Sequence, residues 1–493
     1  MNTRLYSPRL FFLILLILFP LTPESSWAAN HYVRAGSTGA GNGSDWINAC
    51  TDFTGACAVA NLVRGDTYYV ATGVYAARLF NTPESGNLTI TIKGATAADH
   101  GTATGWVSSY GVDASQAQFQ FDSVNRWSIY LGTSYITFDG NTGGGSSIAS
   151  YGFKLQQPAT CTTPQEQYLF VGKVSSSQTT TDVTVKHVAA PACGAAYDVP
   201  QLPFVFGCSQ CYVTNSTFAY LYASGGNKAF QITNVANSTL EYSWSQNQWS
   251  TSGHHGETIS INNCHINDST YCSAACPQGQ CAYNGTLRYN TFRNCTGTAC
   301  IAALDPGYPA SINAWKIYGN IFYDGQAGNG VIATGTSATH YIKDTLIYNN
   351  TFVNIASGNI VWQCGATTSC ASTSGNVFMN NLLYNSGAGL NEGPSGGAIT
   401  HDYNAWISSI GTPPSEQNGQ IGSLNPFMDY SGGNYHLVDG TSLFRGITLS
   451  NPYTMDMDLK VRGGDGKWDI GAYEFTGGAD KTPPGSPQNV RVF

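Results

Sequence analysis

The phrase Ile317-Tyr-Gly-Asn-Ile-Phe322 returns one period later as Ile347-Tyr-Asn-Asn-Thr-Phe352. Each copy alternates apolar and polar residues, then places an asparagine two positions before an aromatic residue. Self-similarity at a fixed period is typical of repeat architectures. The steps between copies are 30, 30 and 31 residues, measured on Asn290, Asn320, Asn350 and Asn381.

The content of the repeat selects the kind of architecture. Alternating runs predict short strands, and the chain has neither the helical spacing of helix-pair solenoids nor the four strands per 40 to 45 residues of propeller blades. The pattern therefore predicts an all-β solenoid of the parallel β-helix type. In stacked coils the asparagines can form hydrogen-bonded ladders in the bends, where asparagine also tolerates the left-handed conformation. The aromatic residues should stack inside the coil, and a weaker copy, Leu240-Glu-Tyr-Ser-Trp-Ser245, fits two shorter turns before Asn290.

These phrases resemble the right-handed parallel β-helix of the pectin-lyase-like superfamily of secreted bacterial proteins, and this resemblance implies a right-handed coil. The resemblance spans roughly residues 30 to 475 and includes the opening phrase His31-Tyr-Val-Arg34. It implies a short N-terminal helix that covers the open end of the coil, because open rungs expose core and strand edges. The helical spacing of Ala58, Val59, Leu62 and Val63 suits such a cap.

The closing phrase Asp469-Ile-Gly-Ala-Tyr-Glu474 resembles the last turns of bacterial surface β-helix proteins. Asp458, Asp469 and Glu474, with Arg462, can be read in two ways. They form either a Ca²⁺ site or a salt-bridge cluster that pins the final turn. The second interpretation is favoured because calcium loops usually show tighter acidic spacing.

The ends of the chain lie outside this fold. Basic residues, an apolar run from Leu10 to Leu21 and the small-x-small site Ser26-Trp27-Ala28 predict a signal peptide over residues 1–28. The β-helix domain is expected over residues 29–475, followed by a Pro-rich linker and one isolated strand over 476–493. The protein should therefore be secreted or cell-surface exposed.

Cysteine usage agrees with export. The 14 cysteines predict disulfides in an oxidising compartment. The expected pairs are Cys50–Cys57, Cys208–Cys211, Cys295–Cys300, Cys364–Cys370 and Cys161–Cys193, with two bridges of open connectivity among Cys264, Cys272, Cys276 and Cys281. No second CxxC accompanies Cys208–Cys211, so a structural zinc site is disfavoured.

Charge limits the partners. Only 10% of residues are charged, the net charge is −8, and lysine and arginine are scattered. This distribution argues against nucleic acid as a partner. No segment after the signal peptide is apolar enough to span a membrane. The expected partner is a polysaccharide, and the expected state is a monomer.

A candidate catalytic stretch is His254-His255-Gly256-Glu257, directly before a predicted strand. It resembles the GHG segment of β-helix hydrolases, which need two carboxylates across the substrate. The paired aspartates of those enzymes are missing, so a second carboxylate would have to come from Glu241, Asp268 or Asp305.

The layout also resembles β-helix lyases, in which Glu257 matches a calcium-binding glutamate. Lyases need a base and a cation that neutralises the uronate carboxylate. The positions of the family's catalytic lysine and arginine hold Asn262-Asn263 and Ile301-Ala-Ala-Leu304. A histidine of the stretch can serve as base in their place.

Two tryptophans, Trp244 and Trp249, lie just upstream and can stack on sugar rings if they are exposed; buried, they belong to the core. Because a fold does not settle function, two hypotheses stand. The first is a protein that binds polysaccharide along its outer sheet face. The alternative is a polysaccharide lyase or glycoside hydrolase that acts at residues 254–257.

Overall fold

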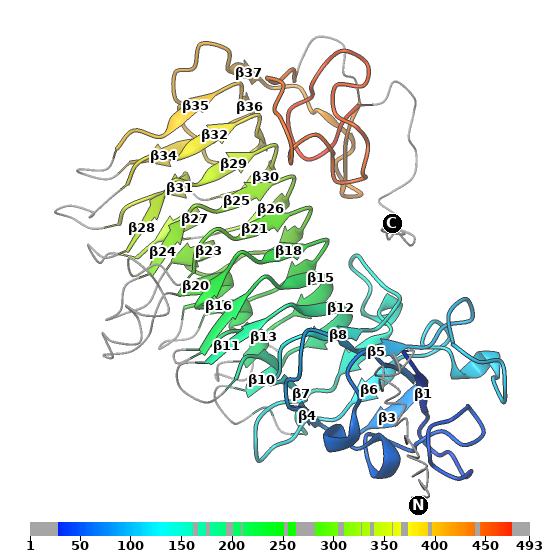
Figure 1. The fold of residues 1–493 in the computed structure, drawn as a ribbon. Coiled ribbons are helices and arrows are strands. Elements are labelled where there is room, and N and C mark those ends of the chain that lie inside the picture. The colour runs from blue at the N-terminus through cyan, green and yellow to red at the C-terminus, as the bar shows by residue number, and fades with distance from the viewer. Residues whose placement is uncertain are drawn as a thin grey trace, which may run out of the picture.

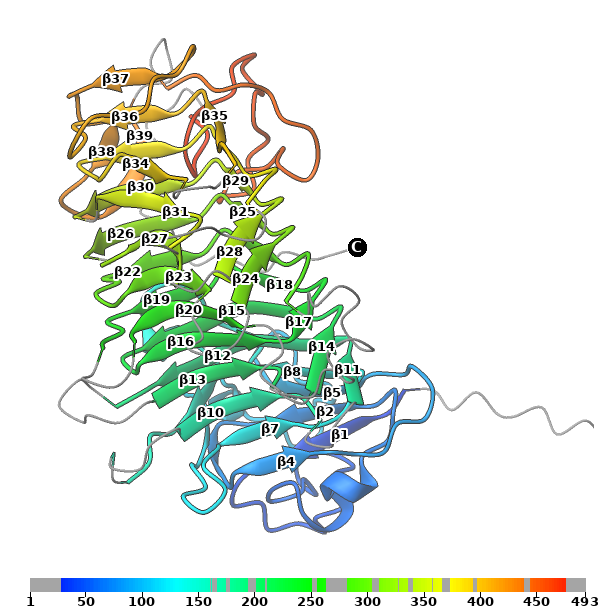
Figure 2. The same ribbon diagram turned by 90° about the vertical axis from the view of Figure 1, so that its left-hand side faces the viewer.

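The computed structural model describes residues 28–159, 161, 166–173, 178–193, 201–208, 211–250, 255–262, 282–303, 310–326, 328–335, 340–356, 358–365, 373–392, 397–438 and 444–475. These residues wind into a right-handed parallel β-helix whose coils stack along one axis (Figures 1 and 2), which confirms the expected fold class. Among them, every strand pair is parallel except the hairpin of β38 (Phe427–Asp429) and β39 (Asn434–Leu437).

A complete coil passes through four faces in turn. Faces 1 and 2 form one 22-stranded sheet, face 3 a 10-stranded sheet, and face 4 a 3-stranded and a 2-stranded sheet. Face 1 consists of β1 (Asn30–Val33), β2 (Thr67–Val70), β5 (Ile90–Gly94), β8 (Ile136–Asp139), the first halves of β12 (Val183–Pro191) and β15 (Thr217–Ser224), β18 (Thr239–Glu241), β21 (Thr286–Arg288), β25 (Lys316–Tyr318), β29 (Leu346–Tyr348), β32 (Val377–Met379) and β35 (Thr400–Asp402).

Face 2 follows after a tight corner. It consists of β3 (Gly73–Tyr75), β6 (Ala117–Phe119), β9 (Phe153–Leu155), the second halves of β12 and β15, β19 (Trp244–Gln246), β22 (Thr291–Arg293), β26 (Ile321–Gly325), β30 (Thr351–Ile355), β33 (Leu382–Tyr384), β36 (Ala405–Ile407) and β37 (Gln420–Gly422).

The remaining two faces complete the coil. Face 3 consists of β4 (Arg78–Phe80), β7 (Ile129–Leu131), β10 (Glu166–Val171), β13 (Gln201–Phe206), β16 (Lys228–Thr233), β20 (Glu257–Asn262), β23 (Ala299–Ala303), β27 (Gly330–Thr334), β31 (Asn359–Trp362) and β34 (Gly389–Asn391). Face 4 consists of β11 (Gln178–Thr181), β14 (Cys211–Thr214), β17 (Val235–Ala236), β24 (Ala310–Asn313) and β28 (His340–Lys343).

The aromatic residues of the repeat stack inside the coil, as expected. Strands β22, β26 and β30 pair in register, so Phe292, Phe322 and Phe352 lie one above another. Their ring centroids are 5.1 and 5.0 Å apart, close to the spacing of adjacent strands. All three rings are fully buried. In this part of the interior, equivalent residues of successive coils therefore stack in a column.

The repeat asparagines form a buried ladder at the corner between faces 1 and 2. The side-chain oxygen of Asn320 accepts hydrogen bonds from the backbone nitrogen and the side-chain amide of Asn290, both at 3.0 Å. Asn350 and Asn381 repeat the same pair of contacts with the preceding member. The left-handed residue of the corner is the one before the asparagine, for example Tyr289 at φ 58°. The ladder asparagine is thus needed for its amide rather than for the bend.

The ladder has defined ends. Its first described contact is from the backbone nitrogen of Ser243 to Asn290, and its last asparagine is Asn404. The backbone nitrogen and side-chain amide of Asn404 donate to the buried carboxylate of Glu416 at 3.0 and 2.7 Å. His401 also contacts that carboxylate at 3.1 Å.

The expectation of two shorter turns before Asn290 is wrong. Ser243 and Asn290 are 47 residues apart, yet they are adjacent ladder members. In addition, β18 pairs directly with β21. One coil joins them, because extra residues inserted between strands add no turn to a solenoid. Residues 263–281, which fall in this interval, lie outside the described residues.

The predicted N-terminal capping helix is also not found. The segment forms only two 3-10 turns, Gly55–Cys57 and Val59–Asn61, separated by Ala58 with ψ 146°. Leu62 is extended at ψ 132°, and Val63 is exposed. The Cys50–Cys57 disulfide closes this segment over a separation of 7 residues. Phe53, Cys57 and Leu62 still bury their side chains in the main core, so an irregular loop takes the place of the helix.

Disulfides join Cys50–Cys57, Cys161–Cys193, Cys208–Cys211 and Cys295–Cys300, as the sequence predicts. Cys364 is also disulfide-bonded, but the expected partner Cys370 lies outside the described residues. The same holds for Cys264, Cys272, Cys276 and Cys281. Among the described residues, no helix is both long and apolar enough to cross a membrane.

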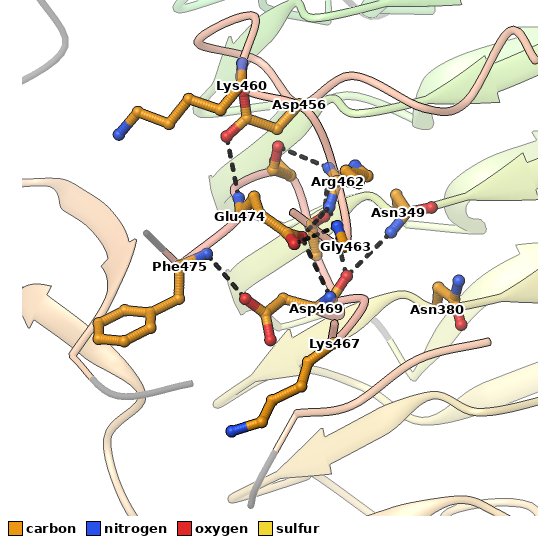
Figure 3. A network of polar contacts seen from close by, with 12 residues as sticks. Asn349, Asn380, Asp456, Lys460, Arg462, Gly463, Lys467, Asp469, Glu474 and Phe475 are labelled. Carbon is orange, nitrogen blue, oxygen red and sulfur yellow. Dashed lines mark hydrogen bonds and ion pairs between the residues drawn. The ribbon is translucent and has the colours of Figure 1, made fainter. Parts of the chain in front are cut away.

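After β37 the chain returns along the outside of the coil, and residues 426–438 and 444–475, the returning segment, lie against faces 1 and 2 (Figure 1). Arg462 organises this segment, because its buried guanidinium donates to the carbonyls of Met455, Asp469, Gly471 and Ala472. Figure 3 shows Arg462 among Asp456, Asp469 and Glu474. The carboxylate oxygen Oε2 of Glu474 lies 3.8 Å from Nη1 of Arg462.

The carboxylates of this cluster bind backbone amides. Asp456 accepts from the nitrogens of Lys460 and Glu474, and Asp469 accepts from that of Phe475. Burial raises the pKa of Asp469 to about 6 and that of Glu474 to about 7. Asp458 instead contacts His436 at 2.7 Å. The acidic residues therefore stabilise the segment as a hydrogen-bonded cluster, and the part of the chain that the structure describes contains no group of three potential metal ligands.

The ladder predicts a stability effect. Asn350→Ala removes the acceptor for Asn320 and the donor to Ile317 and Asn381 in a buried site. Because buried unsatisfied groups cost about 1–3 kcal/mol each, we expect a loss on the order of 3 kcal/mol in the free energy of unfolding, measured by denaturant titration.

Asn385→Gly is the control for this variant. Asn385 has φ 49°, which glycine adopts freely, and its amide makes an exposed contact with Asn354. We expect a change below about 1 kcal/mol. Equal losses in the two variants would contradict a special role for the buried ladder.

Candidate ligand-binding cavity

Two coverings lie on the outer side of face 2. The first is the loop 142–151, where Tyr151 and Ile148 pack with Ala189, Tyr222 and Trp244. The second is the returning segment, where Phe427, Tyr435 and Tyr473 pack over later coils. Strands β19 and β22 lie between the two coverings. Their outward residues therefore remain accessible at one place along the coil.

A cavity of about 360 Å³ occupies this place. The volume is within the range of small-molecule sites. The coil contributes the floor, while the loop and the returning segment contribute opposite walls. The lining residues are Gly145, Ser146, Tyr242, Ser243, Trp244, Tyr289, Thr291, Arg293, Ile321, Tyr323, Gly432, Gly433, Tyr435, Met457, Asp458 and Tyr473.

Aromatic rings dominate the lining. Trp244 meets Tyr323 edge to face at 6.2 Å, and Tyr323 meets Tyr435 at 5.4 Å. Trp244 is half-buried, and its indole nitrogen donates to Gln246 at 3.3 Å. Such rings combine an apolar face with a polar edge, so they suit a ligand with both characters.

The cavity has two charged residues, and they differ in how far they are compensated. Asp458 contacts His436 at 2.7 Å and Lys460 at 3.9 Å. Arg293, with 49% of its side chain exposed, lies 5.4 Å above the ring of Tyr323 and 3.7 Å from the carboxylate of Asp324. An exposed pair of this length contributes little. The guanidinium of Arg293 is therefore open to a ligand.

A row of neighbouring aromatic rings leads to the cavity along the corner between faces 1 and 2. His187, Tyr220, Tyr242 and Tyr289 follow one another with centroid separations of 4.8, 5.1 and 5.2 Å. Burial raises the pKa of Tyr220 to about 12. Arg288 precedes Tyr289, the last ring of the row. Burial lowers the pKa of Arg288, but the contacts of its guanidinium with Glu241 and Tyr318 have a larger effect, so its pKa is raised overall. Gly319 follows in the row at φ 64°, and a Cβ there would lie 2.7 Å from the Tyr289 ring.

The predicted sugar-stacking tryptophans separate. Trp244 lines the cavity, whereas Trp249 is 8% exposed and cannot present its ring to a ligand. The stretch 254–257 lies elsewhere, at the start of face 3. His254 is outside the described residues. His255 is exposed and contacts the hydroxyl of Thr298 at 3.0 Å through Nδ1.

Glu257 is buried, with 1% of its side chain exposed. Its partners in register are Lys228 and Ala299, and Ala299 packs with Ala302 and Ala333 in a small cluster separate from the main core. Lys228 Nζ lies 3.7 Å from a carboxylate oxygen, and among the described residues neither oxygen has a hydrogen-bond partner. Burial raises the pKa of Glu257, while Lys228 and His255 oppose that shift.

The possible second carboxylates do not converge on Glu257 within the described residues. Glu241 forms an ion pair with Arg288 at 2.6 Å on face 1. Asp268 and Asp305 lie outside the described residues. The described part of the stretch thus presents one exposed imidazole beside one buried carboxyl group, without the paired carboxylates of a glycosidase.

Comparisons with known proteins do not identify the site. No protein-family profile matches the chain, and no curated protein matches it by sequence. Pectate lyase Pel9A is 13% identical, with a TM-score of 0.37 over 92% of this chain and 97% of that one. A rhamnogalacturonan lyase is 12% identical, with a TM-score of 0.36 over 92% and 97%. A GH136 lacto-N-biosidase from Eubacterium ramulus is 10% identical, with a TM-score of 0.37 over 80% and 68%. Values this low transfer no residue roles.

Several cavity residues escape a reading of the sequence alone. Tyr435 and Asp458 come from the returning segment, whose docking place the repeat does not encode. Arg293 and Tyr323 occupy equivalent positions of successive repeats, after Phe292 and Phe322. A search for polar and aromatic residues at this outward repeat position would have found them.

The Lys228–Glu257 pair yields a prediction about stability. Lys228→Met leaves a buried carboxylate without its cation, so we expect a loss on the order of 3 kcal/mol in unfolding free energy at about pH 8. A buried carboxyl group with a raised pKa costs stability as pH rises above its unfolded pKa. The loss should therefore shrink toward about pH 4. Denaturant titrations at both pH values measure it.

Glu257→Gln supplies the matching background. In that variant, Lys228→Met removes no compensating charge, so its effect should be small and independent of pH. A loss of the same size in both backgrounds would show that Lys228 acts through packing instead.

Proposed function

We propose that the protein binds polysaccharide in the cavity between the loop 142–151 and the returning segment. The observation that carries the proposal is the lining. Trp244, Tyr323 and Tyr435 offer apolar ring surface with polar edges, and Arg293 offers an open guanidinium. Sugars have apolar C–H faces and hydroxyl edges, which match such rings.

The cellular setting follows from the cysteines. We infer that the protein is exported, because its paired cysteines suit an oxidising compartment. The predicted signal peptide supports the same setting, although residues 1–27 are outside the described residues. Polysaccharides are available to a protein in that setting.

Trp244→Ala tests the proposal. Loss of an aromatic contact surface should weaken binding about tenfold or more, which corresponds to about 1.4 kcal/mol. The measurement is affinity electrophoresis followed by calorimetry on a panel of polygalacturonate, alginate, xylan and arabinogalactan.

Trp362→Ala is the matched control. Trp362 is also half-buried on the outside of the coil, but it lies on face 3 beside Ala299, Ala302 and Ala333. Binding should be unchanged. If no polymer binds the unaltered protein, or if both variants bind like it, the cavity is not the polysaccharide site.

Catalysis at residues 254–257 is the second candidate. It is supported by an exposed imidazole at His255 and by the raised pKa of Glu257, which favours a carboxyl group that holds a proton. Because Glu257 is buried, a substrate can reach its carboxyl group only after the side chains around it move.

Product analysis tests this candidate. A lyase generates unsaturated ends, and a hydrolase generates reducing ends without them. For catalysis at this stretch, Glu257→Gln should lower turnover at least about a hundredfold, in line with loss of a general acid or base. Undiminished turnover in that variant would exclude the stretch.

A further inference from the structure

We infer that the ligand is an oligosaccharide that lies along the strands of face 2, with one end in the aromatic cavity and its continuation in a second, amide-lined groove. This inference rests on the proposed function. It adds a second binding region, an orientation of the ligand parallel to the strands and a dependence of affinity on ligand length.

The second hollow is an open groove at the corner between faces 2 and 3, with a volume of about 490 Å³. Trp249 contributes to it as a largely buried residue. The other lining residues are small or carry amide or hydroxyl groups, and none of the described ones is charged. They are Ala192, Ser224, Gly225, Gln246, Asn247, Gln248, Asn294 and Thr296.

The groove and the cavity are neighbours. Arg293 lines the cavity and the next residue, Asn294, lines the groove. Arg293 pairs in register with Gln246, which also lines the groove. The indole of Trp244 in the cavity donates to the amide oxygen of Gln246. The two hollows therefore meet at one boundary on β19 and β22, and a ligand that crosses it runs parallel to these strands.

The amides of the groove are unequally available. Gln246 already accepts from Trp244 and donates to Tyr222, and Gln248 donates to two backbone carbonyls. Asn294 donates to Asn247 at 3.0 Å, an exposed contact. That contact leaves the Asn247 amide hydrogens and a lone pair of Asn294 for a ligand.

The two regions thus differ in chemistry. The cavity has aromatic rings and the open guanidinium of Arg293, whereas the groove has neutral donors and acceptors that suit sugar hydroxyls. A ligand that fills only the cavity forgoes the hydrogen bonds of the groove. Affinity should therefore rise with chain length until both regions are filled.

The test is calorimetry with oligomers of increasing length, starting from the disaccharide. The probes are galacturonate, mannuronate and xylose oligomers, chosen according to the polymer that binds. The variant is Asn247→Gly combined with Asn294→Gly. Both positions have left-handed backbone, at φ 61° and 55°, which glycine adopts without strain.

We expect the variant to bind the disaccharide like the unaltered protein and the longest oligomers about tenfold more weakly, the loss of roughly one to two hydrogen bonds. Asn385→Gly, at the same corner position of a later coil, should bind all lengths normally.

Two results would overturn the inference. One is an affinity that does not depend on length. The other is a variant that weakens all lengths equally, or none. In both cases Trp244→Ala still reports on the cavity, so the proposed function can survive while the groove is excluded. Absence of binding by the unaltered protein would overturn both.

Discussion

The buried asparagine ladder is the interaction on which the rest of the structure depends. Each ladder oxygen accepts two hydrogen bonds from the member before it, at the corner where the chain turns from face 1 to face 2. This corner otherwise leaves backbone groups unpaired in the interior, where an unsatisfied group is costly. Because the ladder holds successive coils in register, outward residues also align from coil to coil. The floor of the cavity is a product of that alignment.

The cavity depends on a second constraint, the separation between two coverings of the same face. The loop 142–151 packs against Ala189, Tyr222 and Trp244, and the returning segment packs against Trp244 and the coils that follow β22. Arg462 holds the returning segment together by donating hydrogen bonds to backbone carbonyls. The carboxylates of the same segment accept hydrogen bonds from backbone amides. The cluster that resembles a calcium site thus has a mechanical role. It fixes the wall that carries Tyr435 and Asp458.

The repeat made the coil predictable from sequence, because asparagine and phenylalanine at fixed spacing encode contacts between neighbouring coils. Features that depend on one location were harder to predict. Helical spacing at Ala58 and Leu62 suggested a capping helix, yet a disulfide and extended backbone gave an irregular cap. Nothing in the sequence distinguishes Trp244 from Trp249. Trp244 lies on β19 and lines the cavity, whereas Trp249 follows the next corner and is buried. The partners of Trp244 come partly from residues nearly two hundred positions later, which no local pattern reveals.

The contact between Asn404 and Glu416 has a consequence for the length of the ladder. Every ladder asparagine both donates and accepts side-chain hydrogen bonds, so one member can always be followed by another. A carboxylate can only accept. Once Glu416 accepts the two hydrogen bonds of Asn404, it has no N–H to donate to a further member. A single acidic side chain therefore ends the ladder, and it does so with a carboxylate that the aligned amide dipoles favour at that end.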